Sequence, residues 1–270
     1  MDRIKQFATE HPVALGFVIA VVYILVLFVS AMLGALWPGE ETYGQVGGII
    51  GRVASIAVFL ALLYRLGWLR SAGFASLGRW QTWPIALFSL TYAIAVSAYA
   101  MTGNFDFRSA LPGLVIVFIV TAAFLEEVVF RGLMMHVSIR AWGSTTRGLI
   151  KSVLVSSLFF GAMHFLDFFS GRPLPNVFLQ GVEALFLGII LASLVLIGKS
   201  IYPAVFLHGL LNLAGYLNVT GRGIEETASS WLLFSLLMLP LAIYGIYLLR
   251  GLAPRFSTAQ IAFIEDSTNL

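Results

Sequence analysis

The stretch AAFLEEVVFRG, residues 122–132, places two glutamates and an arginine inside an apolar run. The run extends from 111 to 139, which exceeds the roughly 20 residues that a helix needs to cross a bilayer. A charge near the bilayer centre costs about 2.5–3.5 kcal/mol on insertion scales, so such residues usually face the protein interior and mark function. The stretch therefore predicts a transmembrane helix that contributes charged groups to a functional site.

The composition of the whole chain is that of a polytopic membrane protein. Of its 270 residues, 59% are hydrophobic and 11% are charged, and the mean hydropathy is +0.93. The chain has no cysteine, which excludes thiol catalysis. The net charge of +3 comes without a dense basic cluster, so we expect no nucleic-acid partner.

Apolar runs of membrane-spanning length predict an all-α protein with about eight transmembrane helices. The expected spans are 12–37, 44–66, 84–101, 111–139, 151–169, 177–197, 200–217 and 231–249.

We divide the chain into three parts. Residues 1–110 hold helices 1–3, residues 111–217 hold a core of helices 4–7 that includes the opening stretch, and residues 218–270 hold helix 8 and a cytoplasmic tail. Within the first part, the segment 67–83 would place one apolar helical face along the cytoplasmic surface; its members are Leu69, Gly73, Leu77 and Trp80.

Positive charges predict the orientation, because cytoplasmic loops carry an excess of Lys and Arg. With the N-terminus inside, 11 basic residues lie on the cytoplasmic side and only 3, Arg108, Arg172 and Arg222, lie outside. We therefore expect both termini in the cytoplasm.

Helical spacing separates the charges of the opening stretch. Glu127 and Arg131 are four residues apart, so they can pair and lower each other's cost of burial. Glu126 lies about 100° around the helix from Glu127 and can point to another neighbour.

Two further helices present polar groups at the same four-residue spacing. His208 and Asn212 share a face of the seventh span, and Phe160 and His164 share one of the fifth. Counting about 1.5 Å per residue from the cytoplasmic span ends places Glu126 and His164 roughly 20 Å deep and His208 roughly 12 Å deep. We expect one cavity that opens towards the cytoplasm.

Such a cavity suits amide hydrolysis. A glutamate and a histidine can hold and deprotonate a water molecule, and a second histidine with an asparagine can stabilise the oxyanion. The same groups, namely Glu126, His164 and His208, with Glu127 nearby, could instead bind a divalent metal such as zinc. The sequence leaves both options open and makes no cofactor certain.

Three short motifs, EEVVFRG at 126–132, FGAMH at 160–164 and HGLLN at 208–212, resemble the EExxxR, FxxxH and HxxxN motifs of the CPBP family of intramembrane endopeptidases, which includes the type II CAAX prenyl endopeptidases. The resemblance implies an intramembrane endopeptidase, and with the expected cavity we predict that it acts within or beside the cytoplasmic leaflet. It implies that Glu126 and His164 activate water and that His208 and Asn212 stabilise the oxyanion. Glu127, Arg131 and Phe160 would then support the site.

The resemblance also implies the partners, which are the lipid bilayer and a peptide or lipidated protein substrate. A prenylated CAAX-type C-terminus is one candidate for that substrate. Two other classes stay open, a transporter or proton-relay protein and an immunity protein on the same fold.

Three intramembrane groups lie outside the motifs. His136 is expected to be structural, at the cytoplasmic end of its span. Glu183 has no partner on its own helix, and Arg52 is one candidate for it.

Overall fold

The computed structural model describes the backbone of residues 2–35, 41–80, 82–99, 113–222 and 227–265. Every regular element within these ranges is a helix, so the predicted all-α class is confirmed. Arg108 and the side chains of Arg222 and Arg255, which enter the charge count, lie outside the part that is described.

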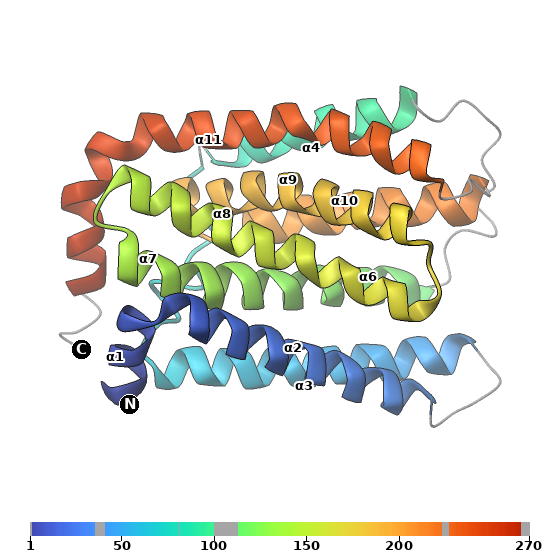
Figure 1. Ribbon diagram of the computed structural model, residues 1–270, viewed down its shortest axis with the longest axis horizontal. Coiled ribbons are helices and arrows are strands. Elements are labelled where there is room, and N and C mark those ends of the chain that lie inside the picture. The colour runs from blue at the N-terminus through green and yellow to red at the C-terminus, as the bar shows by residue number, and fades with distance from the viewer. Residues whose placement is uncertain (1, 36–40, 81, 100–112, 223–226, 266–270) are drawn as a thin grey trace.

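The long helices run alternately up and down, as Figure 1 shows. They are α2 (Pro12–Ala35), α3 (Glu41–Arg65), α4 (Thr82–Tyr99), α6 (Gly113–Glu127), α8 (Thr146–Met163), α9 (Leu174–Gly198), α10 (Tyr202–Arg222) and α11 (Ala228–Glu265). Shorter elements are α1 (Asp2–Glu10), the π-helix η1 (Val128–Met135), α7 (His136–Trp142) and the 3-10 helix η2 (His164–Ser170).

Each of the eight predicted spans overlaps one of these long helices; the fourth continues from α6 through η1 into α7, and the fifth continues from α8 into η2. Within the described residues, six helical segments are long and apolar enough to cross a membrane: Pro12–Met32, Gln45–Arg65, Gly113–Trp142, Thr146–Ser170, Leu174–Gly198 and Ala228–Arg250. The chain is therefore a multi-pass membrane protein by helix length and composition, and α4 and α10 are not among the six.

Helix α9 forms the centre of the bundle. Its span is 72% buried, whereas the other five are between 28% and 44% buried, and it contacts α8, α10 and α11. Outer helices such as α2 leave large apolar side chains exposed, including Phe17, Leu25 and Phe28. In a bilayer this apolar surface would face lipid tails rather than water.

The segment from 66 to 80 is not the predicted surface helix. It forms a series of turns, with Gly67, Gly73 and Gly78 at φ values of 71°, 93° and 89°. Glycine adopts positive φ without steric cost, so these residues interrupt a helix and permit tight turns. The expected common face is absent, since Gly73 is buried whereas Leu77 and Trp80 are 68% and 73% exposed.

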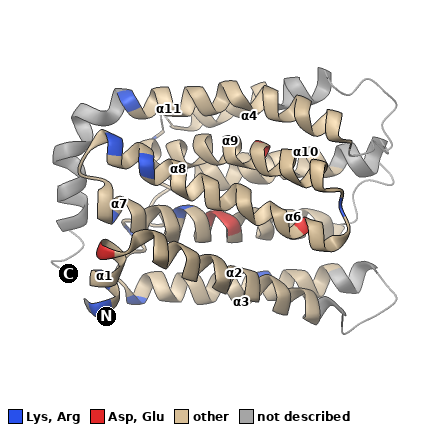
Figure 2. Ribbon diagram, in the orientation of Figure 1, with Lys and Arg blue, Asp and Glu red and all other residues tan. Residues whose placement is uncertain are grey.

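Basic residues gather at the end of the bundle that holds α1 and the start of α8 (Figure 2). We call this the basic end; its cations include Arg65, Arg140, Arg147, Lys151, Lys199 and Arg250. The opposite end carries the loop between η2 and α9, residues 171–173.

Candidate active site

The opening stretch spans a change of helix type. Helix α6 ends at Glu127, and the chain continues as a π-helix from Val128 to Met135 before α7 begins at His136. A π-helix closes its hydrogen bonds over five residues instead of four, is rare, and occurs frequently at functional sites. The two glutamates are therefore the last two residues of the α-helix, directly before the π-helix.

Glu127 is sealed inside the protein by two partners. Its side chain has no exposed surface, and its Oε1 lies 2.9 Å from Nη1 of Arg131 and 2.8 Å from Nδ1 of His208. Arg131 is equally buried and also donates through Nη2 to the carbonyl of Gly188, at 3.3 Å. The predicted Glu127–Arg131 pair is present, and a buried charge is tolerable when paired in this way.

Glu126 has the opposite environment. Its side chain keeps 22% of its surface exposed, and its Oε2 lies 3.4 Å from Nε2 of His208. The hydroxyl of Tyr23, on α2, donates to Oε1 at 3.4 Å. Both contacts are at the long end of hydrogen-bond geometry, so this carboxylate is held loosely.

The His208 ring therefore lies between both glutamates, with Nδ1 towards Glu127 and Nε2 towards Glu126. A neutral imidazole donates from one nitrogen only, whereas a protonated ring donates from both. The tight contact to Glu127 fixes the ring orientation and leaves Nε2 on the cavity side with Glu126.

His164 is oriented by the last turn of α8, the helix that precedes it. Its Nδ1 lies 3.0 Å from the carbonyl oxygen of Phe160. A carbonyl accepts only, so Nδ1 carries the proton and Nε2 of a neutral ring keeps its lone pair. The Phe160 ring meets His164 edge-on at 5.2 Å and His208 at 5.5 Å between centroids, and the guanidinium of Arg131 lies 4.5 Å from its centre. Phe160 therefore packs against both histidines and against Arg131.

A partly open cavity of about 300 Å³ brings the predicted catalytic residues together. Its lining consists of Tyr23, Leu27, Glu126, Phe130, Phe160, Met163, His164, Leu166, Asp167, Gln180, His208 and Asn212. All four predicted catalytic side chains are in this lining, and neither Glu127 nor Arg131 is.

The cavity extends in a direction that differs from the sequence-based expectation. Beyond Glu126 its lining continues to Asp167, on η2, and to Gln180, on the first turns of α9. Helix η2 and the start of α9 adjoin the 171–173 loop, at the end of the bundle opposite the basic end (Figure 1). A depth counted from the basic end alone misses this, because His164 lies close to the other end of its span, Thr146–Ser170.

Polar residues that the sequence motifs did not single out also line this cavity. Arg172 links two of them, because its Nη1 lies 2.8 Å from Oδ2 of Asp167 and 2.8 Å from Oε1 of Gln180. Tyr23 is the third, a phenol in the middle of an apolar helix. Only that unusual position could have marked it in the sequence.

The donor set does not form a ready-made metal site. Among the described residues, no three His, Asp or Glu side chains are grouped as metal ligands would be. Glu126, His164 and His208 line one cavity, and the reaction proposed below is written with groups of the chain itself.

The intramembrane groups outside the motifs have separate surroundings. Arg52 stacks 3.7 Å from the ring centre of Phe118 and donates to that residue's carbonyl at 3.4 Å. His136 is buried, with Nε2 3.3 Å from Oγ of Ser71, as expected for a structural residue. Glu183 is half-buried on α9, and among the contacts of the described residues none joins it to Arg52.

Comparison with known proteins identifies the region that holds the site. Residues 108–214 match the family model described as type II CAAX prenyl endopeptidase Rce1-like. No curated protein and no solved structure matches the chain. The match includes all three motifs and the helices that carry Glu126, His164, His208 and Asn212. Residues 108–214 of this chain are therefore similar to the Rce1-like type II CAAX prenyl endopeptidases.

Proposed function

We propose that the protein is an intramembrane endopeptidase in which Glu126 and His164 activate water and His208 and Asn212 stabilise the oxyanion. The similarity of residues 108–214 to the Rce1-like family supports a membrane protease of the CAAX type. The observation that carries the residue assignment is the separation of the two glutamates. Glu126 lines the cavity with the other three residues, whereas Glu127 is fully buried against Arg131 and His208.

The reaction begins with a water molecule in the cavity. Glu126, with a carboxylate partly open to the cavity, accepts a proton from this water, while Nε2 of His164 accepts a hydrogen bond from it. The water oxygen then forms a bond to the carbonyl carbon of the scissile peptide, and the carbonyl π electrons move to its oxygen.

The resulting oxyanion requires hydrogen-bond donors. We assign this role to the protonated His208 ring, through Nε2–H, and to the amide of Asn212. When the C–N bond breaks, Glu126 returns its proton to the amine. The loose contact between His208 and Glu126, at 3.4 Å, allows Nε2 to turn from the carboxylate to the oxyanion.

Glu127 and Arg131 act through His208. The 2.8 Å contact means that Nδ1–H donates to Glu127 and holds the ring with Nε2 towards the cavity. Because a neutral imidazole donates from one nitrogen only, Nε2–H is present when the ring is protonated. A carboxylate behind an imidazole is a general way to fix its orientation. We therefore assign Glu127 as a positioning residue.

The substrate we propose is a peptide segment that lies in the bilayer beside the cavity, and a prenylated C-terminus is the candidate that the family suggests. The scissile bond would lie in the half of the bilayer nearer the 171–173 loop, because the cavity extends that way. This differs from the cytoplasmic leaflet expected from the sequence.

The decisive variant is Glu126→Gln, which keeps the size of the side chain and removes the base. With a quenched fluorescent peptide, prenylated on its C-terminal cysteine motif, kcat should fall by roughly 10²–10⁴-fold. Glu10→Gln is the matched control, since Glu10 is exposed on α1, and it should retain full activity. Near-normal kcat in Glu126→Gln would refute the assignment.

Two further measurements test whether the substrate must be prenylated and whether the enzyme requires a metal. An unprenylated version of the same peptide tests whether the lipid is required. The metal-free mechanism expects activity to survive dialysis against 1,10-phenanthroline; loss of activity that added zinc restores would favour the zinc-dependent alternative.

A further inference from the structure

A second cavity, of about 330 Å³, lies at the basic end and shares no lining residue with the candidate active site. It forms between the 66–80 segment and the end of α9, and its lining is Arg70, Ala75, Ser76, Gly78, Arg79, Gly198 and Lys199. Three of these seven residues are cationic, and none of the residues described in this lining is acidic. The cavity is therefore suited to an anion.

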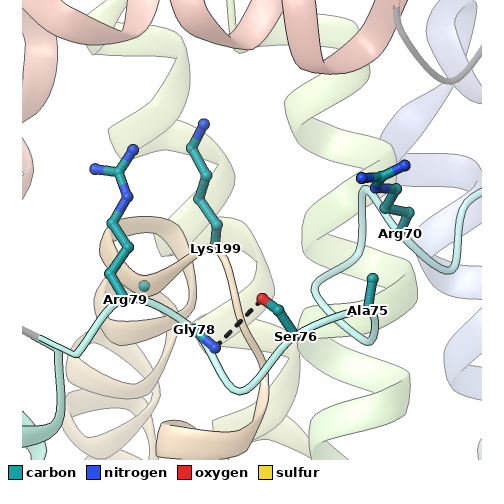
Figure 3. A pocket seen from close by; sticks show the side chains of 7 residues that line it. Arg70, Ala75, Ser76, Gly78, Arg79 and Lys199 are labelled. Atoms are coloured by element: carbon teal, nitrogen blue, oxygen red, sulfur yellow. Dashed lines mark hydrogen bonds between the residues drawn. The ribbon is translucent and has the colours of Figure 1, made fainter.

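Figure 3 shows how the cations are arranged. The side chains of Arg79 and Lys199 extend side by side in the same direction, and Arg70 stands across the cavity from them. Arginine presents a planar set of donors that matches phosphate geometry, and lysine adds a compact charge. One phosphate group could therefore contact cations from two separate segments of the chain.

The walls of this cavity are fixed by contacts between those two segments. The Arg79 amide donates to the carbonyl of Gly198 at 3.1 Å, and the Ser200 hydroxyl donates to the carbonyl of Ser76 at 2.8 Å. Gly78 must be glycine here, because it has φ +89° and a Cβ would lie 2.7 Å from Cβ of Ser200. These contacts hold the backbone that carries Arg79 and Lys199 in a fixed position.

The cations also crowd one another. The pKa of Lys199 is lowered from its ordinary value, first by partial burial and second by the positive charge of Arg79. Its backbone adopts the left-handed conformation, with φ 51°, which is uncommon for a residue other than glycine. A bound anion would offset the repulsion between these two side chains.

The position of the cavity along the spans indicates where the anion comes from. One span ends at Gly198, directly before Lys199, and another ends at Arg65, directly before the 66–80 segment. Trp80, next to Arg79, is 73% exposed. Tryptophan and basic residues at span ends lie at the level of the lipid headgroups.

We propose that this cavity binds the phosphate group of an anionic membrane lipid, with Arg79 and Lys199 as its main contacts. The site is independent of peptide hydrolysis, so its test requires no assay of activity.

The experiment measures lipid bound to the full-length protein in a non-ionic detergent by native mass spectrometry. The probes are dioleoylphosphatidylglycerol, dioleoylphosphatidylcholine and inorganic phosphate at constant ionic strength. The variant is Arg79→Gln with Lys199→Asn, because asparagine tolerates positive φ. The control is Arg65→Gln with Arg250→Gln, which removes two exposed charges from the same end outside the cavity.

We expect phosphatidylglycerol to bind the wild type and the control equally, and to bind the cavity variant roughly thirtyfold more weakly. Equal losses in both variants, or no loss in either, would overturn the site. Inorganic phosphate that bound as tightly as phosphatidylglycerol, or phosphatidylcholine that did so, would overturn the assignment to an anionic lipid. If the cavity variant does not elute as a folded monodisperse protein, Arg70→Gln with Arg79→Gln replaces it, with the same criteria.

Discussion

Glu126 and Glu127 are neighbours of identical chemistry, and the fold gives them opposite surroundings. One keeps part of its carboxylate surface open to a cavity, and the other has none. The 100° step between adjacent helical residues was sufficient to predict this division from the sequence, together with the four-residue spacing of Glu127 and Arg131. No spacing rule within one helix could predict that His208 would contact both, because that depends on how α10 packs against α6.

The hydroxyl of Tyr23 should contribute modestly to catalysis. Tyr23→Phe removes the donor to Glu126 but keeps the ring packing on Phe130, whose centroid is 5.4 Å away. A net hydrogen bond is worth about 1 kcal/mol, so kcat should fall about fivefold. Tyr64→Phe is the matched control, since Tyr64 is 73% exposed, and an equal kcat in Tyr23→Phe and wild type would exclude the role.

The buried pair should dominate stability at this site. Arg131→Met leaves Glu127 buried without its cation, which should cost about 3–5 kcal/mol. The double change Glu127→Gln with Arg131→Met should cost less than the two single changes together, because no uncompensated charge remains. Unfolding in detergent measures this, with exposed Arg65→Met as a control expected within about 0.5 kcal/mol. Strict additivity would contradict a direct pairing energy.

At the scale of elements, hydropathy located all eight long helices because spanning a bilayer requires a run of apolar residues. It could not locate the turns of 66–80 or the π-helix, since both depend on local backbone conformation and packing rather than on polarity. The glycines at 67, 73 and 78 are visible in the sequence, but the helical spacing of apolar residues in the same segment favours a helix and conceals the turns.

The close contact of α8 and α9 lies three residues before His164 and helps to fix its position. A Cβ on Gly161 would lie 2.5 Å from the carbonyl oxygen of Gly181, so the two backbones touch, as small residues permit in membrane helices. Gly161→Ala should therefore destabilise the protein by about 1–3 kcal/mol and reduce activity through displacement of the nearby His164.

The control for this substitution lies on α10. A Cβ added to Gly215 would meet nothing within 4 Å, and the residue is exposed, so Gly215→Ala should leave both unfolding and activity unchanged. Similar effects of the two substitutions would indicate a general cost of altering helical glycines and would contradict the contact argument.

At the scale of the whole molecule, the basic residues and the active-site cavity lie towards opposite ends of the bundle. The basic end carries most of the cations (Figure 2), whereas the active-site cavity extends towards Asp167 and Gln180. If the charges face the cytoplasm, as the sequence predicts, substrate enters from the other side. Counting residues along single spans could not predict this, because the direction of a cavity is set by how several helices diverge.

Labelling of single cysteines tests this arrangement, and the chain contains no natural cysteine to interfere. Ser144→Cys and Ser170→Cys are isosteric changes at exposed positions flanking opposite ends of the same span, Thr146–Ser170. In intact cells an impermeant maleimide should label residue 170, and residue 144 only after permeabilisation. The reverse pattern would place the cavity on the cytoplasmic side and refute the predicted orientation.

The π-helix from Val128 to Met135 sets the phase of the helix that follows it. Because its turns hold more residues than α-helical turns, its eight residues turn the chain through a smaller angle than eight α-helical residues would. If the stretch became a regular α-helix of the same length, His136 and the rest of α7 would rotate relative to Glu126, away from their contacts with Trp68 and Ser71. Exchanges that keep the wide turns preserve this phase, so the winding of the backbone is the property that this stretch must retain.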